Sequence, residues 1–152
     1  MNPSKPVPRF QRFKPCLMPF STATLPPAMS ATLDQAGNDG MAPVCIAVVD
    51  MHGHLLLLQR NPAAAVRSIR IAEAKAYTAV RMGMSTARFQ RRLQDERLSA
   101  QDFMDPGFTS LPGGLPIQGK DGKILGGVGV SGRSPDQDEA LAQAFIDRLA
   151  LN

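Results

Sequence analysis

The chain has 152 residues, of which 43% are hydrophobic and 20% are charged, and its formal net charge is +4. This length suits one domain, and no apolar run approaches the roughly 18 residues that a membrane-spanning helix needs. We therefore expect a single globular domain that is not inserted in a membrane.

The positive charge is concentrated near the N-terminus. Lys5, Arg9, Arg12 and Lys14 lie in a stretch without Asp or Glu, and the rest of the chain holds equal numbers of basic and acidic side chains. A neutral body with one Tyr and no Trp lacks the basic, aromatic-lined surface that polynucleotides require. We therefore expect no nucleic-acid partner.

The N-terminal arm, residues 1–24, contains five prolines among basic and small residues. This composition sustains neither a helix nor a central strand. Pro15 and Pro19 interrupt its apolar residues, so a secretory signal peptide is not predicted. We expect the arm to be flexible or to pack on a neighbouring subunit, and residues 25–152 to form one domain.

The two cysteines, Cys16 and Cys45, match neither a disulfide framework nor a Cys-x-x-Cys metal or redox motif. They indicate a reducing compartment, so we expect a cytoplasmic protein. Cys45 lies in an apolar segment, and we expect its thiol to be buried.

The first regular elements are a helix and a hairpin. Apolar residues three and four apart predict a helix that begins near Pro26 and ends by 37–40. Residues 44–49 are apolar on both faces, as in a strand that is covered on both sides. A turn at 50–53 leads to a second strand at 54–58, and the two strands are predicted to pair.

Two helices are predicted next. Small and apolar residues recur every three or four positions over 68–83, with Ser68 as the expected N-cap. A strongly basic helix is predicted over 86–97, with Phe89 and Leu93 on its packed side.

The last part of the chain combines a loop, a hairpin and a helix. Residues 99–112 are rich in Pro and Gly and are expected to contain at most one helical turn. Strands are predicted at 115–118 and 123–131, followed by a helix that begins at Ser134.

The strand at 123–131 has one apolar face, and its other face is formed by Leu125, Gly127 and Gly129. Glycine lowers the stability of a strand, so its repetition implies that something approaches the backbone closely. A helix, a subunit or a flat ligand would each satisfy this requirement.

The same glycine-rich stretch does not predict a phosphate site. It lacks the spacing of nucleotide-binding loops. Asp136, Asp138 and Glu139 occupy the first turn of the following helix, where they would repel a phosphate.

His52 and His54 are the only histidines of the chain. Two imidazoles and Asp50 are too few ligands to predict a structural metal site. His54 opens the second strand, and two roles remain open for it: a hydrogen-bonded structural role, or the lining of a ligand pocket.

Several short motifs carry a resemblance to a known family. They are Ala47-Val48-Val49-Asp50 with Gly53-His54-Leu55; Arg60 and Ser68; Ile71, Ala72, Lys75, Ala76 and Ala79; Gly113-Gly114-Leu115-Pro116-Ile117; Gly126 with Gly129-Val130-Ser131-Gly132; and Asp138, Glu139 and Ala142. In this order they resemble the GlcG/HbpS family, which also occurs as the C-terminal domain of PduO-type corrinoid adenosyltransferases.

The resemblance implies an α/β (α+β) fold: a compact, profilin- or PAS-like sandwich with a central antiparallel sheet of about five strands flanked by helices. It also implies assembly into a homo-oligomer. Relatives are described as binding or degrading haem or as corrinoid-associated, so haem or another tetrapyrrole is the implied ligand. Haem-binding relatives use a His near the N-terminus or a threonine, but this chain has no histidine before His52. Cys16, Met18 and Met29 are alternative axial ligands.

We therefore carry three hypotheses. The first is an accessory protein that binds haem or another small organic ligand between the glycine face and neighbouring helices, with apolar walls from Met82, Met84 and Phe89. Its predicted ligand-binding residues are His54, Arg60, Lys75, Gly113, Gly114 and Ser131. The second is a small catabolic accessory enzyme with His54 as general base and Lys75 or Arg60 as its electrostatic partner, which requires His54 and Lys75 to share a pocket. The third is a ligand-free assembly subunit.

Overall fold

The computed structural model describes residues 22–149 and residue 151. Almost all of the predicted arm at 1–24 therefore lies outside the described residues, as do Cys16 and Met18 as candidate iron ligands. The last residues of the predicted arm form a short 3₁₀ turn, η1 (Thr22–Thr24), directly before the predicted domain.

Helices and strands follow in the predicted order. They are α1 (Leu25–Asn38), β1 (Cys45–Asp50), β2 (Leu55–Arg60), α2 (Arg67–Met82), α3 (Thr86–Glu96), the 3₁₀ helix η2 (Ala100–Phe103), β3 (Gly114–Gln118), β4 (Ile124–Ser131) and α4 (Pro135–Asp147). The fold is thus α+β, as expected. None of the described helices is long and apolar enough to cross a membrane.

The strands form one antiparallel sheet in the order β2-β1-β4-β3. Among the described residues it has four strands, one fewer than the resemblance implied. The segment between α3 and β3 adds no strand to this sheet, and η2 occupies its first part.

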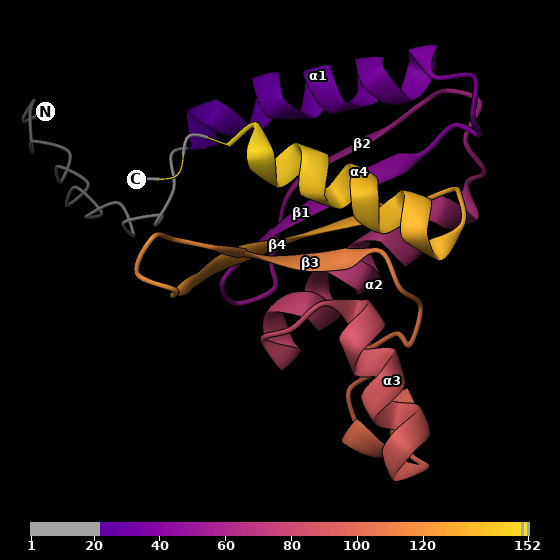
Figure 1. Cartoon of the computed structure of the whole chain (residues 1–152), viewed down its shortest axis with the longest axis vertical. Coiled ribbons are helices and arrows are strands. Elements are labelled where there is room, and N and C mark those ends of the chain that lie inside the picture. The colour runs from indigo at the N-terminus through magenta and orange to yellow at the C-terminus, as the bar shows by residue number, and fades with distance from the viewer. Residues whose placement is uncertain (1–21, 150, 152) are drawn as a thin grey trace, which may run out of the picture.

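Helices cover both faces of the sheet. Figure 1 shows α1 and α4 side by side on one face and α2 on the other. The face toward α1 and α4 carries the main core, in which Met29, Ile46, Val128 and Phe145 are fully buried. The predicted two-sided burial of β1 is therefore confirmed, since five of its six residues are buried.

The glycine face of β4 is occupied by α2. A Cβ on Gly129 would lie 2.1 Å from the Ala72 carbonyl oxygen, and one on Gly127 would lie 2.6 Å from the Ala76 carbonyl oxygen. Such distances leave no room for any side chain, so helix and sheet backbones pack directly together. Of the three explanations for the glycines, the helix is correct, and the proposed ligand site between this face and its helices is wrong because α2 fills that space.

The helix ends follow local capping chemistry. Ser134 and Gln137 form a capping box at the start of α4, with Pro135 in the first turn, as predicted. Gly83 ends α2 in the left-handed conformation. The predicted N-cap Ser68 is wrong: α2 begins at Arg67, its N-cap is Val66, and Ser68 is buried in the first turn.

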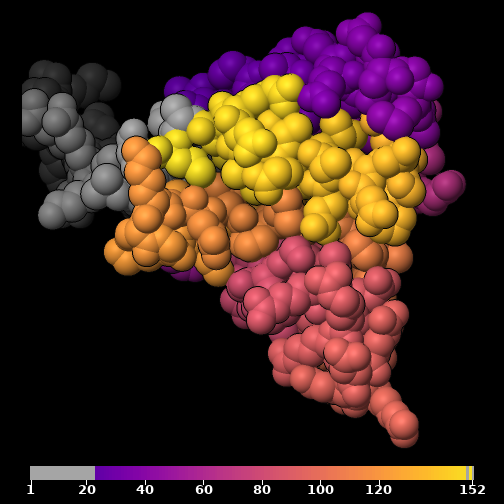
Figure 2. Space-filling view, in the orientation of Figure 1, coloured from indigo at the N-terminus to yellow at the C-terminus, as the bar shows by residue number. Residues whose placement is uncertain are grey.

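A second, smaller core lies away from the sheet. Helix α3 and η2 project from the body of the molecule (Figures 1 and 2). Phe89 is fully buried there and contacts the rings of Phe103 and Phe108 edge to face. Phe89 therefore belongs to a packed aromatic cluster, together with Met82 and Met84, and not to the wall of a site on the glycine face.

Candidate functional site

The predicted ligand-binding residues lie at two ends of the sheet and do not surround one cavity. Cys45 pairs with Arg60 of β2 and with Ser131 of β4, so Arg60 and Ser131 share one end. His54 lies at the other end, where its carbonyl accepts a hydrogen bond from the Asp50 N–H. Because β2 is extended, about 20 Å separates His54 from Arg60.

Lys75 is buried at the Arg60 end. Its Nζ donates to Asp138 Oδ2 at 2.8 Å and to the Val130 carbonyl at 2.7 Å. Val130 pairs with Ile46, next to Cys45 and far along β1 from Asp50. Lys75 and His54 therefore share no pocket, and the acid–base mechanism that required their convergence has no geometric basis.

The Lys75–Asp138 ion pair joins α2 to α4 near the C-terminal end of β4. Burial lowers the pKa of Lys75, and the hydrogen bond to Asp138 opposes that shift. Burial likewise raises the pKa of Asp138, and Lys75 opposes that shift in turn. Asp138 Oδ1 also accepts the backbone N–H of Arg133, so both carboxylate oxygens have partners.

Gly113 and Gly114 lie against this ion pair. A Cβ on Gly113 would lie 2.9 Å from Lys75 Nζ, and one on Gly114 would lie 2.3 Å from the Lys75 carbonyl oxygen. The Gly114 N–H donates to Thr86 Oγ1 at 2.8 Å. The structure thus brings Lys75, Gly113 and Gly114 together, in a packed junction.

Arg60 organises the loop between β2 and α2. Its Nη1 donates to the Pro62 carbonyl at 3.1 Å and to the Ala64 carbonyl. Its guanidinium therefore holds a turn of the chain just before α2 begins.

His54 is the most exposed of the predicted residues, with 80% of its side chain accessible. It lies in the β1–β2 turn, and its Nδ1 is 3.2 Å from Asp50 Oδ2. Burial favours a raised pKa for Asp50, but hydrogen bonds from the backbone N–H groups of His54 and His52 and from the His54 ring outweigh it and lower that pKa. Asp50 is thus a carboxylate that fixes both the turn and the imidazole.

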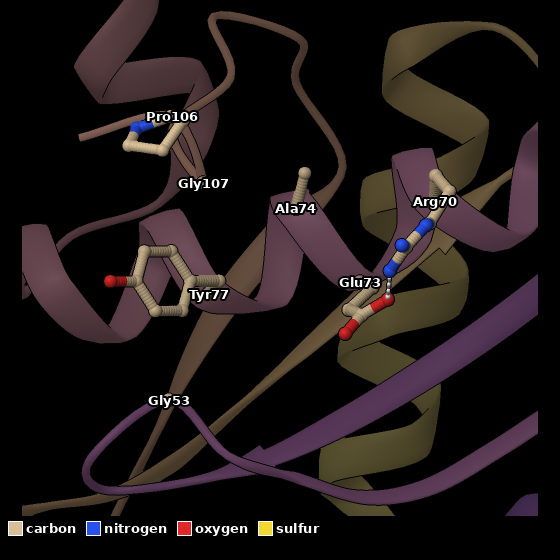
Figure 3. Close-up of a pocket in the computed structure, with 7 residues that line it drawn as sticks. All are labelled: Gly53, Arg70, Glu73, Ala74, Tyr77, Pro106 and Gly107. Carbon is tan, nitrogen blue, oxygen red and sulfur yellow. Dashed lines mark hydrogen bonds and ion pairs between the residues drawn. The ribbon is translucent and has the colours of Figure 1, made fainter.

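A pocket of about 440 Å³ lies beside this turn. Gly53 forms one wall, Pro106 and Gly107 form the opposite wall, and the Tyr77 ring lies between them (Figure 3). A Cβ on Gly53 would approach the ring to 2.6 Å, and one on Gly107 would approach it to 2.8 Å. Both glycines therefore permit the backbone to contact the ring of Tyr77.

Polar groups lie at two sides of this pocket. The Tyr77 hydroxyl donates to Asp105 Oδ2 at 2.8 Å, and this hydrogen bond to a carboxylate raises the pKa of Tyr77. Arg70 and Glu73 form an ion pair at 3.1 Å one turn along α2 (Figure 3). Tyr77 was not among the predicted site residues; the available signal was that it is the only Tyr of the sequence and lies on a predicted helix.

Ser131 lines a different pocket, of about 370 Å³, at the opposite end of the sheet from His54. It shares that pocket with residues from the start of α2 and from the loops before β1 and after β4. Of the predicted residues, Ser131 thus lines a pocket, His54 lies on the turn beside the Tyr77 pocket, and Lys75, Gly113 and Gly114 form a packed junction.

Of the three proposed alternative iron ligands, Met29 alone lies in the part of the chain that the structure describes. Met29 is fully buried in the main core, so its thioether is inaccessible and this candidate is wrong. Cys45, the other cysteine, is also fully buried, and burial raises the pKa of its thiol to about 11.

Comparisons with known proteins identify the relatives of this fold. A family model described as "Haem degrading protein HbpS-like" matches residues 20–147. An uncharacterised 15.0 kDa protein of Citrobacter freundii, from the dhaT-dhaS intergenic region, is 34% identical over 132 residues, which cover 84% of this chain and 92% of that protein.

Two solved structures share the architecture. The PduOC:heme complex superposes with a TM-score of 0.70 at 28% identity, covering 86% of this chain and 92% of that one. HbpS superposes with a TM-score of 0.73 at 32% identity, covering 84% and 88%. The family model spans nearly all of the described residues, and the motifs of the hairpin, α2, β4 and α4 lie inside that span. The chain therefore belongs to the HbpS-like family.

Proposed function

We propose that this protein is a binding module for haem or a related tetrapyrrole, and that the ligand lies against the β1–β2 turn and the Tyr77 pocket. The membership of the HbpS-like family and the likeness to a PduOC:heme complex support this class of ligand. The proposal moves the site from the glycine face, which α2 covers, to an open pocket on the outer side of α2.

The observation that carries the proposal is the His54–Asp50 pair. An ionised carboxylate only accepts hydrogen bonds, so Asp50 fixes the proton of a neutral His54 ring on Nδ1. The lone pair on Nε2 is then free, and the side chain is exposed. Histidines that bind metals are commonly held in this way, with a carboxylate on the second ring nitrogen.

The neighbouring pocket suits the rest of such a ligand. The Tyr77 ring and Pro106 contribute apolar surface to its lining. Arg70 is exposed at the rim and is able to pair with a carboxylate substituent. A bound haem would supply a redox-active iron, while His54 would hold it and Asp50 would orient the imidazole.

The test is a haem titration of the full chain, followed by absorption spectroscopy. We expect a shifted Soret band that saturates near one equivalent per chain, and we expect His54→Ala to abolish the shifted band or weaken haem binding at least about tenfold. Asp50→Asn should weaken binding less, because the imidazole remains but loses its orientation.

His52→Ala is the matched control. His52 lies on the same turn, and its ring centroid is 6.2 Å from that of His54. Among the described residues, however, no carboxylate forms a hydrogen bond with the His52 ring. It should retain the wild-type spectrum. A wild-type protein without a Soret shift would overturn the haem proposal, and a His54→Ala variant with the wild-type spectrum would overturn the assignment of His54.

A further inference from the structure

The pocket that Ser131 lines is a candidate for a second binding site, separate from the Tyr77 pocket. It lies at the Cys45 end of β1, away from His54, and it is bordered by Ala42, Pro43, Ala63, Ala65, Arg67, Ser68, Ser131, Gly132 and Arg133. None of these lining residues is acidic. We propose that this pocket binds the carboxylate of a small organic acid.

Two buried hydroxyls point to a ligand. Ser68 is 3% exposed and Ser131 is 5% exposed, and they come from different elements, α2 and β4. Neither hydroxyl has a hydrogen-bond partner within the described residues. Every described side-chain oxygen that is fully sealed from solvent does have a partner, so these two oxygens are not fully sealed. Both hydroxyl oxygens therefore keep some contact with solvent, and both residues line the pocket, where a bound partner would satisfy them.

The charges around the pocket favour an anion. Arg67 is exposed and forms no ion pair within the described residues, and the first turn of α2 contains no acidic side chain. The positive end of the α2 dipole adds to this field. Arg133 is already engaged, because its guanidinium binds Asp39 and the carbonyls of Ala36 and Ala42.

The remaining walls favour an organic acid over an inorganic anion. Ala42, Pro43, Ala63 and Ala65 present small apolar surfaces around the polar groups. A carboxylate on a short carbon skeleton would place its oxygens near Arg67, Ser68 and Ser131 and its carbons against these walls. Phosphate would also contact Arg67, Ser68 and Ser131, but it has no carbon atoms to pack against the apolar walls.

The close approach of two loops gives the pocket a fixed shape. A Cβ on Gly132 would lie 2.4 Å from the Pro43 carbonyl oxygen, so the loop after β4 passes directly over the loop before β1. The Arg133–Asp39 ion pair, 2.7 Å long, ties the same loop to the end of α1. The loop after β4 is therefore held at two points against the segment that joins α1 to β1.

Isothermal titration calorimetry of the full chain with lactate, butyrate and succinate tests the proposal. We expect at least one of them to bind at concentrations below about 10 mM, and its methyl ester and inorganic phosphate to bind more weakly. Arg67→Gln and Ser131→Ala should each weaken that binding about tenfold, because each removes a charged or hydroxyl partner of the carboxylate.

Arg91→Gln is the matched control, because Arg91 is also an exposed arginine without an ion pair among the described residues, but it lies on α3 and lines neither proposed site. It should leave acid binding unchanged. The proposal is overturned if none of the three acids binds, if phosphate binds more tightly than the acids, or if Arg91→Gln weakens binding as much as Arg67→Gln. Arg67 is exposed, so its variant keeps the test decisive even if Ser131→Ala impairs folding.

Discussion

At the scale of the residue, Lys75 was predicted to bind a ligand, but its side chain forms a buried ion pair that stabilises the fold. It lies on the alanine stripe of α2 that packs on the sheet, and it is 4% exposed. Asp138 is the acidic partner that balances its charge, from an element 63 residues away. Each charge offsets the cost of burying the other.

We predict that Lys75→Met lowers the free energy of unfolding by about 3–5 kcal/mol, because Asp138 would remain as a buried charge without its partner. The double variant Lys75→Met, Asp138→Asn should recover part of this loss, since the charge is then gone and Asn retains the acceptor for Arg133. Urea denaturation of the three proteins measures these differences.

Lys123→Met is a suitable control for this prediction. Lys123 forms an exposed ion pair with Asp121 in the β3–β4 turn, and its removal should leave the urea midpoint nearly unchanged. A Lys75→Met variant as stable as Lys123→Met would show that the buried pair contributes nothing to the fold.

At the scale of the element, the packing of α2 on β4 depends on glycines where another protein would use side chains. We predict that Gly129→Ala lowers the free energy of unfolding by about 3 kcal/mol or more, since the new Cβ would lie 2.1 Å from a carbonyl oxygen of α2. Gly37→Ala, in the exposed last turn of α1, has nothing within 4 Å and should raise it by about 0.5–1 kcal/mol. Chemical denaturation of both variants tests the contrast, which equal effects would contradict.

Elements with strong local signals could be predicted from the sequence. Helix α4 follows its Ser134 cap and Pro135, and β1 follows its unbroken apolar run, so both lie within a residue of their predicted starts. The start of α2 was less predictable, because Val66 caps it without a side-chain hydrogen bond. Local chemistry therefore specifies these elements better than it specifies their exact ends.

The candidate sites could be predicted only in part, because they depend on contacts between distant segments. Ser131 lines a pocket and His54 lies next to Gly53 of another, but nothing in their spacing shows that they lie at opposite ends of the sheet. The Tyr77 pocket needs Gly53 and Gly107 on either side of one ring. Lys75 lacked a visible partner in sequence, so its structural role was missed.

At the scale of the whole molecule, the buried hydrophobic residues of the described part of the chain form one large core and several smaller clusters. The main core lies between the sheet and the α1–α4 layer, whereas Phe89, Leu93 and Ala100 form a separate cluster beyond α2. The hydrogen bond between Thr86 and the Gly114 N–H is one of the few polar ties between the two. A small core with few ties has less apolar contact to lose when it opens.

We predict that α3 opens in a sub-global step, at a lower free energy than the sheet. In native-state hydrogen exchange, the α3 amides should exchange through an opening whose free energy is clearly below that of the amides of β1 and β4. Thr86→Val should lower the α3 value further, because it removes the hydroxyl that holds the Gly114 N–H, while leaving the β1 value near that of the wild type. Equal exchange free energies in α3 and β4 would instead mean that the aromatic cluster unfolds only with the whole domain. The pockets beside Pro106 and Gly107 would then lie on a rigid unit, whereas an independent opening of α3 would make the Tyr77 pocket adjustable from one side.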